Sequence, residues 1–135
     1  MRFMMLVIPK GYEKAKPGTM PDPEMVKQMM VYNESLEKAG VLLELNGLHP
    51  VSTGARVTFE KGKTRVEIGS FSDLKETLGG YWIIQVKSRD EAIEWASKAP
   101  MADGDIIEIR QVQEMSEFPP EIQAIERQFA GKGAS

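Results

Sequence analysis

The chain has 135 residues, of which 41% are hydrophobic and 27% charged, so its length and composition are those of one globular domain. Its 17 Lys and Arg against 20 Asp and Glu leave a net charge of −3 without a dense basic patch, which argues against a nucleic-acid partner. The absence of cysteine excludes disulfides, thiolate metal sites and cysteine nucleophiles, and it agrees with a cytoplasmic location.

The N-terminal third predicts a strand followed by an amphipathic helix. The segment from Arg2 to Ile8 is almost wholly apolar, which is typical of a strand covered on both faces, and it is too short to span a membrane. Asp22 and Pro23 then form a helix start, because Asp can accept from free backbone N–H groups and Pro fits the first helical position. The helix is expected to run from Pro23 to Ala39. Its apolar face repeats at steps of three and four and comprises Met25, Met29, Tyr32, Leu36 and Ala39.

The middle of the chain predicts a strand and then a hairpin. Val41 to Leu45 is an apolar strand that ends in a turn containing His49. Arg56 to Glu60 and Thr64 to Ile68 alternate apolar and polar residues around a turn centred on Gly62, the pattern of a hairpin with one wet face. The residues expected to face inward are Val57, Phe59, Val66 and Ile68.

A polar loop from Gly69 to Gly80 leads into the second half of the domain. Tyr81 to Val86 is predicted as another strand buried on both faces. Ser88 and Glu91 form a capping box, in which Ser88 can bond the third helical N–H and Glu91 can bond back. The helix that they open ends at Pro100.

The last predicted strand, Asp105 to Val112, closes a domain of residues 1–112. Residues 113–135 form a C-terminal extension with a short amphipathic helix, which needs a surface to lie on. The apolar residues of this helix are Ile122, Ile125 and Phe129. The order strand, helix, strand, hairpin, strand, helix, strand contains two β-α-β units and predicts an α+β, ferredoxin-like fold with an antiparallel sheet.

Standard catalytic and nucleotide-binding motifs are missing from the sequence. One histidine cannot build a multi-histidine metal site, and Asp103-Gly104-Asp105 only faintly suggests a carboxylate site, so neither a metal nor a cofactor is expected. His49 is the most interesting candidate, because imidazole changes its charge near neutral pH and this one directly follows a buried strand. The alternative is an ordinary surface histidine in a Leu-His-Pro turn. The loop from Gly69 to Gly80 can likewise be a pocket wall or a solvated connection.

The RFMMLV strand, the L-H-P turn, the hairpin and the run GSFSDLKETLGGYWII followed by DEAIEWA resemble the YCII-related proteins of the DGPF type over roughly residues 1–112. In that group the loop typically reads D-G-P-F-A-E-T-K-E-x-L-G-G-F. The positions that match in this chain are Gly69, Phe71, Lys75, Glu76, Leu78, Gly79 and Gly80. Ile68, Ser70 and Asp73 replace Asp, Pro and Glu, so a role of the first acid does not carry over.

The resemblance implies a dimeric α/β barrel, in which two copies pack together as a homodimer. A homodimer is also expected because the two most apolar strands, Arg2 to Ile8 and Tyr81 to Val86, need cover on both faces. The resemblance implies little about activity, because most members have no established function. A few relatives look like lyase-type enzymes for which a His-Asp pair has been proposed, and others are encoded beside or fused to sigma factors.

The leading hypothesis is therefore a protein that binds a small molecule of unknown identity, with or without catalysis, between the sheet and the Gly69–Gly80 loop. In an enzyme, His49 and Asp73 would form the catalytic acid/base pair. The expected ligand-binding residues are Arg56, Phe71, Lys75 and Tyr81. The rival hypothesis is a non-catalytic regulatory or protein-interaction module.

Overall fold

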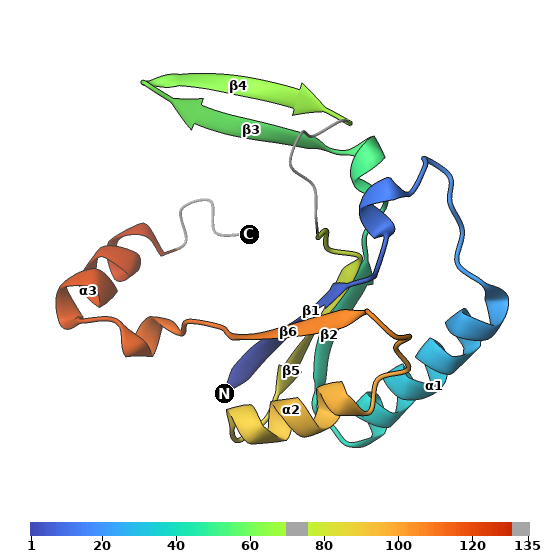
Figure 1. Ribbon diagram of the computed structural model, residues 1–135. Helices are drawn as coiled ribbons and strands as arrows, with labels where there is room; N and C mark the ends of the chain where they lie inside the picture. The colour runs from blue at the N-terminus through green and yellow to red at the C-terminus, as the bar shows by residue number, and fades with distance from the viewer. Residues whose placement is uncertain (70–75, 131–135) are drawn as a thin grey trace.

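The computed structural model describes residues 1–69 and 76–130. Its core is a four-stranded antiparallel sheet that carries two helices on one face (Figure 1). The strands are β1 (Arg2–Ile8), β2 (Leu42–Gly47), β5 (Gly80–Gln85) and β6 (Ile106–Gln111), and the helices are α1 (Pro23–Lys38) and α2 (Arg89–Ser97). The predicted α+β class and antiparallel sheet are confirmed.

The strand order is β2-β5-β1-β6, so the two β-α-β units interleave. The strands of the first unit, β1 and β2, both pair antiparallel with β5, which lies between them. The strands of the second unit, β5 and β6, lie on either side of β1 in the same way. Each helix therefore joins two strands that are parallel but not adjacent, and both helices can cover the same face.

The hydrophobic core lies between this face and the two helices. Its buried residues are Phe3, Met5, Tyr32, Leu36, Val41, Trp82, Ile84, Val86 and Ala92. The Tyr32 ring packs edge-on against Trp82 with centroids 5.3 Å apart, and the Tyr32 hydroxyl donates to the Trp95 carbonyl at 2.6 Å. Trp82 Nε1 donates to Asn33 Oδ1 at 2.7 Å. These contacts connect α1 to both the sheet and α2.

The opposite face of the sheet is only partly covered within one chain. Burial alternates along β1, where Phe3 and Met5 are buried and Met4 and Leu6 are half-buried. The same alternation occurs along β5, where Ile83 is half-buried. Among the described residues α1 and α2 cover the same side, so cover on both faces of the two strands depends on the expected homodimer and stays a prediction.

The predicted hairpin is present as β3 (Ala55–Glu60) and β4 (Lys63–Ile68), which form a separate two-stranded sheet. Its turn contains Lys61 and Gly62, both with positive φ, which suits the twist of a two-residue hairpin loop. The hairpin projects away from the core (Figure 1). Its apolar residues are exposed: Val57 by 52%, Phe59 by 79%, Val66 by 57% and Ile68 by 79%. The prediction that these residues face inward is wrong within one chain.

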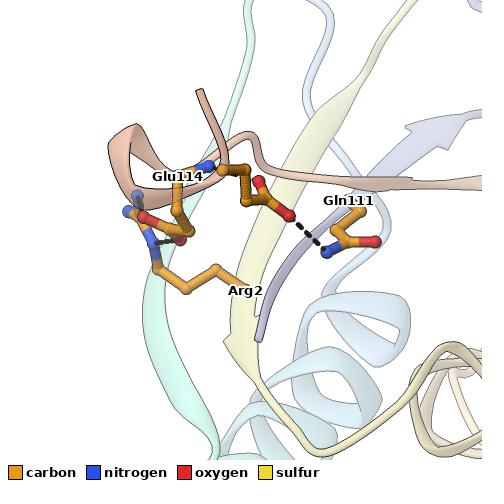
Figure 2. A network of polar contacts seen from close by, with 4 residues as sticks. Arg2, Gln111 and Glu114 are labelled. Carbon is orange, nitrogen blue, oxygen red and sulfur yellow. Dashed lines mark hydrogen bonds and ion pairs between the residues drawn. The ribbon is translucent and has the colours of Figure 1, made fainter. Parts of the chain in front are cut away.

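After β6 the chain leaves the sheet as an arm that ends in α3 (Pro120–Phe129), as predicted for the C-terminal extension. The Arg2 side chain ties the start of this arm to β1 (Figure 2). Its Nε and Nη2 atoms donate to the two carboxylate oxygens of Glu114 at 2.6 and 2.9 Å. None of the residues of α3 is buried.

The N-terminal caps of α1 and α2 each differ in one respect from the caps predicted from the sequence. Ser88 Oγ accepts from the Glu91 N–H at 3.2 Å as predicted, but the Glu91 carboxylate accepts from the Lys87 N–H instead of returning to Ser88. At α1 the Asp22 side chain caps no N–H group of the described residues, and its backbone carbonyl accepts from Val26 instead. Within residues 1–69 and 76–130, no helix has the length and apolarity needed to cross a membrane.

Candidate functional site

An open cleft of about 460 Å³ lies at the base of the hairpin. It is formed by the turn after β2, the 3-10 turn Val51–Thr53, the first residues of β3 and the segment that leads into β5. His49, Arg56, Glu76 and Thr77 are among the residues that line the cleft. The cleft therefore brings together basic, acidic and hydroxyl side chains from segments that are distant in sequence.

Gly79 holds the His49 turn against the sheet. Its N–H donates to the Val7 carbonyl at 2.7 Å, and its carbonyl accepts from the Leu48 N–H at 2.9 Å. The Tyr12 hydroxyl donates to the Leu48 carbonyl at 2.6 Å, which fixes the same turn from a second direction. A Cβ atom at residue 79 would come within 2.6 Å of the Pro9 ring, so this close approach requires glycine.

Thr77 has the most unusual environment in the cleft. Its side chain is only 6% exposed, and its Oγ1 is buried without a hydrogen-bond partner among the described residues. Thr53 in the same cleft is different, because its Oγ1 donates to the Pro50 carbonyl at 2.8 Å. An unsatisfied buried hydroxyl costs about 1–3 kcal/mol, so within residues 1–69 and 76–130 the Thr77 hydroxyl is a group whose hydrogen-bonding capacity is unused.

The structure brings only some of the predicted site residues together. His49 and Arg56 share the cleft, and both are exposed. Tyr81 lines a separate cavity of about 210 Å³ beside α1, where its hydroxyl accepts from Asn46 Nδ2 at 2.9 Å. The remaining predicted residues lie outside the described residues; they are Phe71, Asp73 and Lys75.

Asp105, the second acid of the Asp103-Gly104-Asp105 turn before β6, has a structural role. Asp105 Oδ1 accepts from the Lys10 N–H at 2.8 Å, and its Oδ2 accepts from the Ala102 N–H at 2.9 Å. Within the described ranges, no three histidine or acidic side chains gather into a group that could hold a metal ion. Sequence reasoning did not single out Thr77, because burial of a threonine in a polar loop has no periodic signal.

The comparison with known proteins agrees with the resemblance found in the sequence. A curated protein of Rhizobium meliloti (strain 1021), described as uncharacterised, is 29% identical over 75 residues. These residues are 56% of this chain and 60% of the relative, so the chain spans less than two thirds of the length of the protein that it matches. Residues 1–116 match the YCII-related domain. Because this match covers most of the chain, the protein belongs to the YCII-related domain family.

Proposed function

We propose that this protein binds a small anionic molecule in the cleft beside His49. The observation that carries the proposal is the buried hydroxyl of Thr77, a residue of that cleft, which has no hydrogen-bond partner in the part of the chain that the structure describes. Rotation about the Cα–Cβ bond of Thr77 would turn this hydroxyl toward a ligand in the cleft. His49 and Arg56 carry further donor groups in the same cleft, and several polar groups in one cleft are what a small-ligand site needs.

The catalytic form of this proposal assigns proton transfer to His49, with Asp73 as its orienting partner. Asp73 lies outside the described residues, so this pairing rests on the sequence alone. The replacement His49→Gln would then abolish turnover while leaving stability nearly unchanged, because His49 is exposed.

The protein is also proposed to act in the cytoplasm as a ferredoxin-like homodimer that forms a dimeric α/β barrel. The strand order and the placement of both helices on one face support this assembly. The uncovered face of the sheet supports it further, because Met4, Leu6 and Ile83 are only half-buried in one chain. A second copy would cover this face.

The ligand site is tested by removing one hydroxyl at a time. Thr77→Val keeps the shape of the side chain, and without ligand it should leave the protein equally stable or more stable, because an unpaired buried hydroxyl is lost. Thr53→Val is the matched control in the same cleft, and it should destabilise by about 1 kcal/mol because its hydroxyl is bonded. Chemical denaturation of the three proteins measures both changes.

Thermal shifts with benzoate and a panel of small carboxylates then measure binding. We expect the apparent melting temperature of the wild type to rise with ligand concentration, and the rise to be smaller in Thr77→Val. A wild type that responds to none of the carboxylates would remove the anionic ligand class. A loss of stability in ligand-free Thr77→Val would show that the hydroxyl is structural.

A second candidate is a non-catalytic regulatory or protein-interaction module. The exposed apolar residues of the hairpin and of α3 favour it, because such surfaces commonly mark sites of protein association. The two candidates are separated by the carboxylate thermal shifts together with a test of protein binding by the hairpin. A cleft that binds no carboxylate, in a protein that retains another protein through its hairpin, would favour the module.

A further inference from the structure

Two elements outside the core present apolar faces to solvent. On the β3–β4 hairpin the apolar residues share one face, because Val57 pairs with Val66 and Ala55 pairs with Ile68 across the strands. The alternate positions carry charged residues such as Arg56 and Glu67 on the other face. Four large apolar side chains, exposed by 52–79%, therefore form an apolar face that nothing in the described chain covers fully.

The C-terminal helix α3 has a matching stripe. Ile122, Ile125 and Phe129 recur at steps of three and four, so they lie on one side of the helix. They are exposed by 41%, 54% and 59%, and none of the helix is buried. A ten-residue helix in water is marginal without packing, so this helix needs a surface against its stripe.

The hairpin and the C-terminal arm also carry opposite charge. Residues 55–68 have four basic and two acidic side chains, a net charge of +2. Residues 115–130 have one basic and three acidic side chains, a net charge of −2. The hairpin's charged strand residues lie on the face opposite its apolar residues, so the opposite signs attract the two segments at long range and do not form contacts on the apolar face.

Within one chain the two segments leave the sheet at diagonally opposite corners. The hairpin follows β2 at one edge of the sheet, whereas α3 follows β6 at the other edge. The two segments also leave the sheet at opposite ends of its strands. The last residue of β2 aligns with the first residue of β5, near Val7, whereas the last residue of β6 aligns with Phe3. A second copy can bring the two corners together, and a two-fold axis makes the contact occur twice.

We propose that α3 of one copy packs its apolar stripe on the apolar face of the β3–β4 hairpin of a second copy, and that the exchange is reciprocal. The inference rests on the homodimer of the proposed function and adds the elements that hold it. Each buried Val, Ile or Phe side chain removes roughly 60–120 Å² of apolar surface from water. The exchanged arms therefore contribute on the order of 500 Å² on each copy, less than the about 800 Å² of a standard interface, and the open sheet face supplies the rest.

The absence of cysteine allows a direct test by disulfide trapping. Val66→Cys and Ile125→Cys are made in two separate chains with different tags, and the two chains are co-expressed and oxidised. Because each chain carries one introduced cysteine, a disulfide that joins the two tags links two copies of the protein. We expect it to be several-fold more abundant than the disulfide of a matched control pair, Thr58→Cys with Ala124→Cys, which places the thiols on the opposite faces of the hairpin and the helix.

Three outcomes would overturn the exchange. The first is equal trapping of the two pairs. The second is a disulfide-linked monomer from a chain carrying both Val66→Cys and Ile125→Cys, which would place α3 on its own hairpin. The third is a wild type that stays monomeric by light scattering at micromolar concentration, which would remove the proposed dimer as well. A wild-type dimer without specific trapping would remove the arm exchange alone.

Discussion

The core strands and the hairpin each present an apolar face, but the two faces meet different surroundings. In β1 and β5 the apolar face packs against α1 and α2, and Met5 and Ile84 are fully buried. In β3 and β4 the equivalent face is exposed, with Ile68 at 79%. An apolar strand face in the sequence therefore predicts that the face will be covered, but it does not identify the element or the molecule that covers it.

The largest expected effect on stability comes from comparing an isoleucine-to-alanine substitution in the core with the same substitution in the hairpin. Ile84→Ala should reduce the free energy of unfolding by about 2–5 kcal/mol, because it opens a cavity in a fully buried site. Ile68→Ala should cost less than about 0.5 kcal/mol in the monomer, because the side chain is already in water. Denaturation at low protein concentration measures both.

Repeating these measurements at high protein concentration sharpens the comparison. If a second copy covers the hairpin, Ile68→Ala should become clearly destabilising as the dimer forms, whereas the effect of Ile84→Ala should change little. An equal loss for the two variants at every concentration would show that the hairpin is packed in the monomer and that the comparison is wrong.

Most of the element order could be predicted because it depends on local patterns. Arg2 to Ile8 is a strand with the predicted bounds, and Tyr32 and Leu36 form the buried stripe of α1. The outer members of that stripe, Met25 and Ala39, are exposed because they lie near the helix ends. The orientation of the hairpin could not be predicted, because its alternation is the same whether its own chain or another molecule covers it.

The candidate site was less predictable than the fold, because it depends on contacts between distant segments. His49 and Arg56 could be proposed from chemistry and position, and the cleft does place them together. Tyr81 was predicted beside them, but its strand register turns it toward a different cavity. Thr77 stands out only when burial and hydrogen bonding are both known.

The next-largest expected effect is a loss of stability at alkaline pH. It depends on the Tyr32 hydroxyl, which makes a polar contact in the core. Burial raises the pKa of Tyr32 from its usual 10.0 to about 12. The neutral form is therefore favoured in the folded state, and this stabilisation is complete below pH 10 and is lost as the pH rises from 10 to about 12. The free energy of unfolding should fall by about 1.4 kcal/mol for each pH unit in this range.

Tyr32→Phe provides the control for this alkaline effect. At pH 7 it should cost about 0.5–1.5 kcal/mol, because the hydrogen bond to the Trp95 carbonyl is lost. Between pH 10 and 12 the variant should lose less stability than the wild type, so the two curves approach or cross. Parallel curves from pH 9 to 12, measured by denaturation, would show that Tyr32 does not contribute to the pH dependence.

The smallest expected effect concerns the tether of the C-terminal arm, and it separates local from global stability. Hydrogen bonds from Arg2 hold the pKa of Glu114 below its usual range, so the ion pair survives mild acid and is lost as the pH falls through that lowered value.

Glu114→Gln removes the pair at neutral pH. Because the pair is partly exposed, with side chains 41% and 37% accessible, we expect no measurable change in the midpoint of global unfolding, but several-fold faster amide exchange in residues 115–130. Glu108→Gln is the control, since its partner Arg110 lies on the same strand and tethers no other element, and it should leave exchange in the arm unchanged. Equal exchange of the arm in the wild type and Glu114→Gln would show that docking on another surface, and not the Arg2 contact, holds the arm in place.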